Sequence, residues 1–143
     1  LVLDTNTCIS GLLWDGNEAK LIRKVESGEA SSFTSKEILE EINAVIRRGK
    51  FEKNLNLAKT TADRVLSKIG NLSTTVIGLK LEENVVKEDK SDDKFIECAL
   101  NAKADIIVTG DEHLLKIKEY RNIKIMTTAD VLKLLKNRAL PEK

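Results

Sequence analysis

The sequence predicts a three-layer α/β/α domain with a central, mostly parallel sheet of the Rossmann-like kind. Short apolar runs alternate with helical patterns along the chain, and such alternation favours a parallel sheet with helices on both sides. The runs rich in Val and Ile, such as "ADIIVTGD", are continuous and do not alternate with polar residues, as expected of strands buried on both faces. With 143 residues the chain is long enough for one domain with a substantial core.

The expected elements follow one another without a visible repeat or linker. Apolar runs predict strands at "LVLD", "SSFTS", "TTVIGL", "ADIIVTGD" and "IKIMT". Helical patterns are expected over residues 17–27, 36–48, 55–69 and 92–103, in a short segment from Glu112, and over 129–136. We expect one domain over residues 1–137 and a polar C-terminal tail over 138–143, which contains the single proline.

The composition is that of a globular protein. Apolar residues make up 41% and charged residues 33%, which excludes an intrinsically disordered chain. No apolar run approaches the length of a membrane span and no signal peptide is visible, so the cytoplasm is the expected location. Because Leu1 is not an initiator methionine, we expect a short N-terminal piece to be missing.

Bulk charge does not point to nucleic acid, since the net charge is only +1. The chain has five aromatic residues (three Phe, one Trp and one Tyr), which leaves little material for base stacking. The best local candidate for RNA contact is "RRGKFEKNLNLAK", with Arg47, Arg48, Lys50, Lys53 and Lys59. A solvated helix end and loop explains this stretch equally well.

The two cysteines do not form a recognisable metal motif. Cys8 and Cys98 have no CxxC spacing and no clustered histidines, so a zinc site is not expected. We expect both to behave as small buried apolar residues. A redox pair is the alternative.

Two aspartates stand where predicted strands end. Asp4 ends "LVLD", with Asn6 two residues later, and Asp111 ends "IIVTGD". Parallel sheets bind ligands at the carboxyl ends of their strands, so these side chains predict a shared site. The alternative is that each one caps the start of a following helix.

Helix geometry selects Glu41 from the acids of "KEILEEINAVIRR". The apolar stripe of this helix is formed by Ile38, Leu39, Ile42, Val45 and Ile46. At 100° per residue, Glu41 lies at the edge of the stripe and Glu40 points away from it. Glu37, one turn earlier, is a possible partner of Glu41.

The same geometry favours Asp92 in "KEDKSDDKFIECAL". The core-facing residues of this helix are Phe95, Ile96, Ala99 and Leu100, and Asp92 projects from the middle of their stripe. Asp93 lies towards the edge, where we expect it to support Asp92. The alternative is that Ser91 caps the helix and both aspartates merely favour the positive end of its dipole.

Four acids, Asp4, Glu41, Asp92 and Asp111, are therefore expected to meet. Carboxylates packed together repel one another, and burying them unpaired is unfavourable. A hard divalent cation such as Mg²⁺ or Mn²⁺ resolves this conflict because it prefers oxygen ligands. One or two such ions could activate a water and neutralise charge on a phosphodiester. His113, the only histidine, is expected to be exposed in a charged turn.

Nearly the whole chain resembles the PIN-domain ribonucleases, in particular the toxin-like branch of toxin–antitoxin systems. "LVLDTN" looks like the first strand and first acidic motif of that family, and "SKEILEEINAVIRRGKF" is similar to its second motif, whose essential glutamate falls on Glu41. "DKSDDKFIECALNAKADIIVTGDEHLL" looks like the third and fourth motifs, with essential acids at Asp92 and Asp111. Thr109 matches a hydroxyl residue that supports the site, and Asn6 matches the polar position after the first aspartate.

The resemblance implies a single PIN-like nuclease domain that uses Mg²⁺ or Mn²⁺ to hydrolyse phosphodiester bonds of RNA. It also implies a toxin that is often a homodimer and is often inhibited by a small antitoxin protein. All four acids are present, so we expect an active enzyme. The sequence departs from the branch at Lys90, where proline is usual. This change alters loop stiffness but not the ligands.

Two other functions are compatible with parts of the sequence. A non-catalytic domain that binds RNA or a protein partner could retain the acids for metal binding or fold stability. A phosphatase of the haloacid-dehalogenase type needs an Asp-x-Asp-x-Thr motif, which "DTNT" nearly supplies. However, Asn6 stands where that enzyme needs its general acid, so the phosphatase is the weaker alternative.

Overall fold

The strands form one sheet, in which nearly all adjacent strands run parallel to each other. The computed structural model describes residues 1–77, 80–81, 85–86 and 92–139. In these residues the sheet has six strands in the order β3-β2-β1-β4-β6-β5. All neighbouring strands are parallel except β5, which is antiparallel to β6. Their bounds are β1 (Val2–Leu3), β2 (Ser32–Ser35), β3 (Ser73–Val76), β4 (Ile106–Val108), β5 (Glu119–Tyr120) and β6 (Ile123–Met126).

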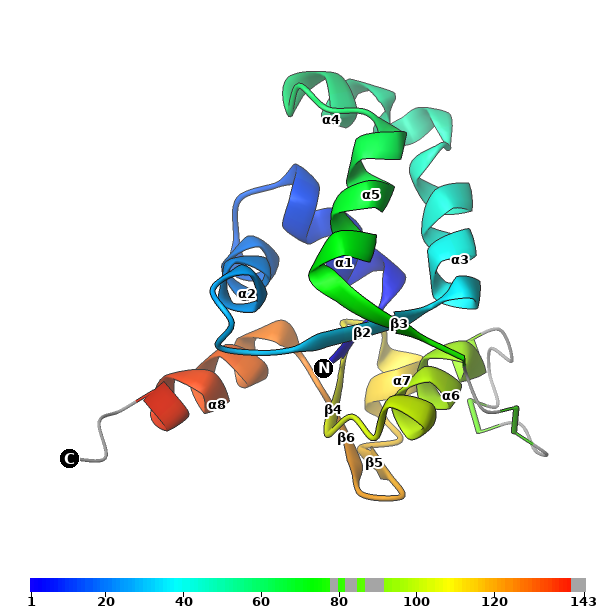
Figure 1. Cartoon of the computed structure of the whole chain (residues 1–143), viewed down its shortest axis with the longest axis vertical. Coiled ribbons are helices and arrows are strands. Elements are labelled where there is room, and N and C mark those ends of the chain that lie inside the picture. The colour runs from blue at the N-terminus through cyan, green and yellow to red at the C-terminus, as the bar shows by residue number, and fades with distance from the viewer. Residues whose placement is uncertain (78–79, 82–84, 87–91, 140–143) are drawn as a thin grey trace.

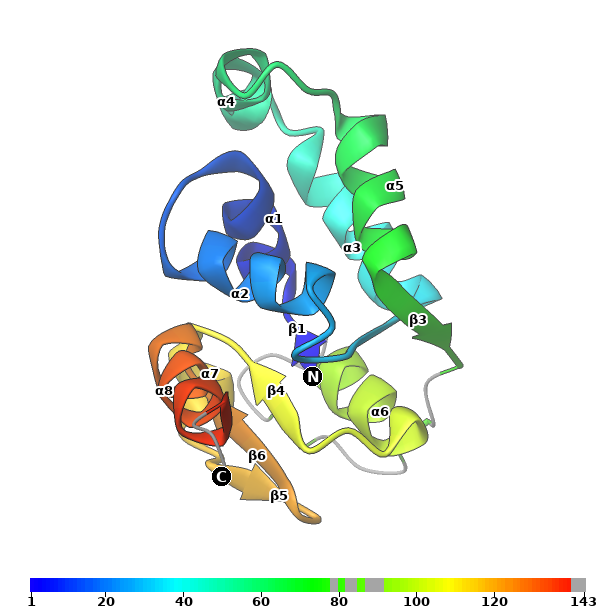
Figure 2. The same ribbon diagram turned by 60° about the vertical axis from the view of Figure 1, so that its left-hand side comes forward.

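Helices cover both faces of this sheet, which confirms the predicted three-layer α/β/α architecture (Figures 1 and 2). On one face α1, α2, α3 and α5 pack against one another, and α6 packs against β1, β2 and β4. α8 lies beside α2. The bounds are α1 (Thr5–Leu13), α2 (Asn17–Glu26), α3 (Lys36–Ile46), η1 (Gly49–Phe51), α4 (Glu52–Leu57), α5 (Ala62–Leu72), α6 (Asp93–Ala102), α7 (Glu112–Leu115) and α8 (Thr128–Ala139).

The two central strands are completely buried. Val2 of β1 and both Ile107 and Val108 of β4 have no exposed surface, because helices cover the sheet on each side. The continuous apolar runs therefore correctly indicated strands buried on both faces. Since all the strands that carry sequence-predicted site residues are parallel, their carboxyl ends meet at one edge of the sheet.

The sequence missed the first helix, α1. Its buried residues are Thr5, Thr7, Cys8, Ile9 and Gly11, so the inward face consists largely of small and polar side chains. Such a face gives a weak apolar periodicity. The short antiparallel strand β5 (Glu119–Tyr120) was also missed, since two residues carry no pattern.

The single helix expected over residues 55–69 is wrong, because the structure divides this region into α4 and α5. Lys59 adopts a left-handed conformation with a φ of 55°, which ends the first helix. Thr61 then caps α5, because its hydroxyl accepts a hydrogen bond of 3.2 Å from the Arg64 amide. The left-handed residue ends one helix and the threonine cap starts another, although the apolar pattern continues across both helices.

Both cysteines are buried free thiols, as predicted. Cys8 is 4% exposed and Cys98 is fully buried. Burial raises the pKa of the Cys98 thiol to about 12 and also raises the pKa of Cys8. Both side chains are therefore protonated at neutral pH and act as apolar packing groups. No helix in the described residues combines the length and apolar character needed to cross a bilayer.

α1 and α2 approach each other closely at Gly11. A Cβ atom added there would lie 2.6 Å from Cγ1 of Ile22 and 3.0 Å from the carbonyl oxygen of Glu18. Both positions belong to α2, and the second is backbone, which cannot rotate away. The lack of a side chain at Gly11 therefore allows the two helices to pack this closely.

Replacing this glycine tests the close approach. Gly11→Ala is expected to lower the free energy of unfolding by about 1–3 kcal/mol, because the helices must move apart. The matched control is Gly70→Ala in α5, where an added Cβ meets nothing within 4 Å and alanine is expected to add up to about 1 kcal/mol through helix propensity. Urea unfolding measures both. A neutral or stabilising Gly11→Ala would mean that α1 and α2 are further apart.

Candidate active site at the carboxyl edge of the sheet

Pairing of β1 with β4 brings Asp4 next to Thr109. The strands pair Val2 with Ile107 and Leu3 with Val108, and the Asp4 amide continues the ladder by donating to the Val108 carbonyl at 3.1 Å. The Thr109 hydroxyl donates a hydrogen bond to Oδ2 of Asp4. The same hydroxyl oxygen accepts a hydrogen bond of 3.0 Å from the Asp111 amide. One threonine therefore links the two strand-end aspartates.

Both aspartates also cap helices, so the alternative reading of these residues holds as well. Oδ1 of Asp4 accepts a hydrogen bond of 2.9 Å from the Thr7 amide at the start of α1. Oδ1 of Asp111 accepts one of 2.8 Å from the His113 amide at the start of α7. In each case the cap engages one carboxylate oxygen. The cap therefore fixes the orientation of the carboxylate at the sheet edge.

The surroundings of Asp4 disfavour its ionised form. Its side chain is 5% exposed, and this burial raises the pKa of Asp4 above its ordinary value of 3.8. The hydrogen bonds from Thr109 and Thr7 act in the opposite direction, while the negative charge of Asp111 raises the pKa of Asp4 further. The two carboxylates are therefore close enough to repel each other, and a cation between them would relieve that repulsion.

Glu41 reaches the same neighbourhood from α3. Ser35 caps this helix by accepting a hydrogen bond of 3.2 Å from the Ile38 amide. The Glu41 side chain is 25% exposed whereas Glu40 is exposed, as the helical periodicity predicted. The hydroxyl of Thr5, which directly follows Asp4, donates a hydrogen bond to Oε2 of Glu41.

Lys94 provides a positive charge at Glu41. Its ammonium group forms an ion pair with Oε1 of Glu41, and the Lys94 side chain is only 17% exposed. Lys94 lies in the first turn of α6, so this pair joins α3 to α6 across the site. A partly buried carboxylate needs such a counter-charge. Neither Lys94 nor Thr5 was predicted from the sequence, although each stands directly beside a predicted acid.

Asp92 and Asp93 are both buried, at 8% and 7% exposure, but the structure gives them different surroundings. Asp92 occupies the N-cap position of α6, and the helix begins at Asp93. Oδ1 of Asp93 accepts hydrogen bonds of 2.8 Å from the Val86 amide and 3.2 Å from the Val85 amide. Asp93 therefore anchors the backbone of residues 85–86 to the helix. Ser91, the alternative cap, and Lys90 lie outside the described residues.

Three further polar residues lie at the periphery. Asn6 is exposed on α1, whereas Asp4 is buried. The His113 ring is 50% exposed, as predicted, and its Nδ1 is 3.9 Å from Oδ1 of Asp111. Glu37 pairs with Lys80 at 4.0 Å, so its ionic partner is that lysine.

The chemistry of these donors fits a hard cation better than zinc, because they are carboxylates and hydroxyls. Among the described residues, however, no three His, Cys, Asp or Glu side chains are grouped closely enough to hold a metal ion. Asp4 and Asp111 are linked through the Thr109 hydroxyl, which bonds the Asp4 carboxylate and the Asp111 amide. Glu41 has Lys94 as its present counter-ion.

The raised pKa of Asp4 predicts a pH-dependent stability difference. In metal-free buffer, Asp4→Asn is expected to be more stable than the unmodified protein at pH 7, because the unmodified protein loses stability as pH rises through the raised pKa. The difference should become much smaller near pH 3, well below the ordinary pKa of 3.8, where Asp4 is mostly neutral in both folded and unfolded chains. Thermal unfolding in EDTA at the two pH values measures it.

Asp15→Asn serves as the control for that measurement. The Asp15 side chain is 93% exposed, so the substitution removes the same charge without relieving burial. Its stability relative to the unmodified protein should be nearly independent of pH. If Asp4→Asn is instead less stable at pH 7, the hydrogen bonds to the Asp4 carboxylate outweigh the unfavourable burial of its charge.

Comparison with known proteins agrees with this architecture. The family model for the PIN domain matches residues 1–113. The chain is 31% identical over 121 residues to the uncharacterized protein MJ1680 of Methanocaldococcus jannaschii, a match that covers 83% of this chain and 75% of the relative. No solved structure gave a significant match. The family match includes both strand-end aspartates, Glu41 and the start of α6, and the chain therefore belongs to the PIN-domain family.

Proposed function

We propose that the protein is a metal-dependent endoribonuclease whose active site contains Asp4, Glu41, Asp92 and Asp111. PIN domains are generally metal-dependent nucleases, and they bind RNA. The observation that carries the proposal is the link that the Thr109 hydroxyl makes between the Asp4 carboxylate and the backbone amide of Asp111. Burial raises the pKa of Asp4, and the negative charge of Asp111 raises it further, which supports a cation at this edge.

The residues of the proposed site either bind the ion or orient the side chains that bind it. Asp4 and Asp111 would hold the ion. The Thr109 hydroxyl orients the Asp4 carboxylate, and the His113 amide orients the Asp111 carboxylate. Glu41 and Asp92 complete the proposed ligand set. When bound, Mg²⁺ or Mn²⁺ supplies charge neutralisation for a phosphodiester and acidifies water.

Thr5 and Lys94 position Glu41. The Thr5 hydroxyl binds one carboxylate oxygen and the Lys94 ammonium binds the other. A cation that engages Glu41 competes with Lys94 for the same carboxylate. A displaced Lys94 would remain beside the site, where its charge can attract a substrate phosphate.

A pair of adjacent glutamates offers a sharp test of catalysis. With Mn²⁺ and a 5′-labelled single-stranded RNA, Glu41→Gln is expected to lower kcat/KM by at least about 100-fold, because loss of outer partners alone often costs a metal site 10–100-fold. Glu40→Gln removes an equal charge from the exposed face of the same helix and should leave kcat/KM within about twofold. Cleavage products are separated on a denaturing gel, with EDTA as the metal-free control.

The two alternatives predict different results in that assay. RNA binding without cleavage under Mg²⁺ or Mn²⁺ would favour a non-catalytic domain, for which the Lys94–Glu41 ion pair would be the permanent counter-charge. Hydrolysis of a chromogenic phosphomonoester without RNA cleavage would favour the phosphatase. Equal activity of Glu41→Gln and Glu40→Gln would refute the proposed site while leaving a nuclease elsewhere on the chain.

The neighbouring aspartates of α6 separate metal binding from stability. Asp92→Asn is expected to weaken Mn²⁺ binding by at least about tenfold, since a proposed ligand loses its charge. Asp93→Asn should retain Mn²⁺ affinity but lower the free energy of unfolding by about 1–3 kcal/mol, because charge-assisted bonds to the Val85 and Val86 amides are weakened. Isothermal titration with Mn²⁺ and urea unfolding measure the two effects. The opposite pattern would make Asp93 the ligand.

The finer biological role is also a proposal. The motif resemblance supports a cytoplasmic toxin paired with an antitoxin protein, and the helical pair α3 and α5 offers a surface for a homodimer. Leu57 of α4, at the end of this helical unit, is 73% exposed, which supports an apolar contact there. Light scattering of the purified chain tests the dimer, and rescue of growth by a co-expressed neighbouring gene tests the antitoxin.

A further inference from the structure

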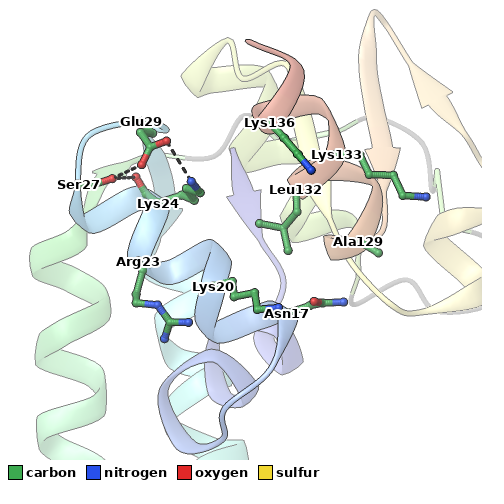
Figure 3. A pocket seen from close by; sticks show the side chains of 10 residues that line it. All are labelled: Asn17, Lys20, Arg23, Lys24, Ser27, Glu29, Ala129, Leu132, Lys133 and Lys136. Carbon is green, nitrogen blue, oxygen red and sulfur yellow. Dashed lines mark hydrogen bonds and ion pairs between the residues drawn. The ribbon is translucent and has the colours of Figure 1, made fainter. Parts of the chain in front are cut away.

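A basic groove runs between α2 and α8, outside the proposed active site. It encloses about 770 Å³, and the two helices that form its walls pack against each other. Figure 3 shows the side chains around it. The lining residues are Asn17, Lys20, Arg23, Lys24, Ser27 and Glu29 on one wall and Ala129, Leu132, Lys133 and Lys136 on the other.

Helical periodicity places the basic residues of each wall on one face. On α2, the residues Lys20, Arg23 and Lys24 are separated by three and four positions, which is the spacing of one helix face. On α8, Ala129, Leu132, Lys133 and Lys136 follow the same spacing. Ala129 and Leu132 supply apolar surface, and the lysines stand at the rim.

Most of this positive charge is not neutralised by the protein. Lys24 forms an ion pair of 3.1 Å with Glu29, which also accepts a hydrogen bond from Ser27 (Figure 3). Arg23 lies 4.0 Å from the highly exposed Asp15. By contrast, Lys20, Lys133 and Lys136 have no ion-pair partner in the part of the chain that the structure describes.

The nearby acids do not cancel this charge. Glu26 of α2 pairs with Lys68 at 3.1 Å. Neither Glu26 nor the two other acids of these helices, Glu18 and Asp130, lines the groove. The lining therefore contains five basic side chains and one carboxylate, that of Glu29. This charge asymmetry fits an anionic occupant.

The groove begins at the edge that carries the proposed active site. α8 starts at Thr128, immediately after β6 ends at Met126. β6 is parallel to β4, so the Ala129 end of the groove lies towards the carboxyl edge of the sheet. The α8 segment from Ala129 to Lys136 spans about 10 Å at 1.5 Å per residue.

We propose that this groove binds the phosphate backbone of single-stranded RNA and guides it to the carboxyl edge. The proposal rests on the nuclease function proposed above. No aromatic residue lines the groove, so bases have no stacking platform there. Lysines act as point charges for phosphates, and binding through them is strongly salt-dependent and independent of base sequence. Continuity with the site edge favours RNA over an acidic protein.

The binding test compares two triple variants with equal charge changes. Lys20→Ala/Lys133→Ala/Lys136→Ala removes the unpaired lysines of the groove. Arg48→Ala/Lys50→Ala/Lys53→Ala removes three exposed cations from the connection after α3 and the first turn of α4, which is the other basic candidate of this chain. Fluorescence anisotropy of a labelled 20-nucleotide oligouridylate is measured in EDTA over a range of KCl concentrations, so that binding is observed without cleavage.

The groove variant is expected to bind the RNA about 10- to 100-fold more weakly at 0.1 M KCl. Its slope of log K against log[KCl] should fall in magnitude by about 2, since each lost phosphate contact contributes about 0.7. The control variant should remain within about threefold. Equal affinity of the groove variant and the unmodified protein would overturn the proposal, as would equal losses in both variants.

Two further arms identify the occupant and separate this proposal from the nuclease assignment. If a labelled decaglutamate binds through the three lysines while the RNA does not, the groove is a protein-docking surface and the proposal is wrong. With Mn²⁺, the groove variant should raise KM for the 20-nucleotide RNA by about tenfold and leave kcat unchanged. If no cleavage occurs at all, the nuclease proposal fails, whereas the EDTA binding result still decides the groove.

Discussion

The parallel pairing of β1 with β4 is the constraint on which the rest of the site depends. These strands are more than a hundred residues apart in sequence, and their ladder ends with the Asp4 amide on the Val108 carbonyl. Thr109, which directly follows β4, donates its hydroxyl to the Asp4 carboxylate, and its amide donates to the Met126 carbonyl of β6 at 3.0 Å. A register shift of one residue would turn Asp4 to the other face of the sheet and break the link to Asp111.

Charge balance governs the remaining architecture of this edge. Asp4 is buried and the Glu41 side chain is only 25% exposed, which is unfavourable unless each carboxylate finds a donor or a cation. The chain supplies hydroxyls from Thr5 and Thr109, helix-start amides, and the ammonium of Lys94. The donors come from other elements, so packing of α3 and α6 against the sheet is coupled to compensation of the charges. This explains why α3 and α6 meet through an ion pair rather than through apolar contact alone.

Sequence patterns predicted the helix faces and strand ends well, because both follow from fixed periodicities. The partly buried position of Glu41 beside an exposed Glu40 is an example. Sequence could not show that Asp93 binds the Val85 and Val86 amides, since those partners are fixed only by the tertiary path of the chain. The sequence did not reveal the division into α4 and α5, because the left-handed Lys59 leaves the apolar pattern intact. α1 escaped detection because small and polar residues form its buried face.

The ion pair between Lys94 and Glu41 has a consequence for how the protein matures. Because the chain provides its own counter-charge at Glu41, the polypeptide has no need of an ion to close this part of the fold. Under the proposed function, folding and metal binding would then be separate events, unlike in small zinc domains where the ion drives folding. A newly synthesised molecule would fold first, and the supply of divalent ions would then determine when it becomes active.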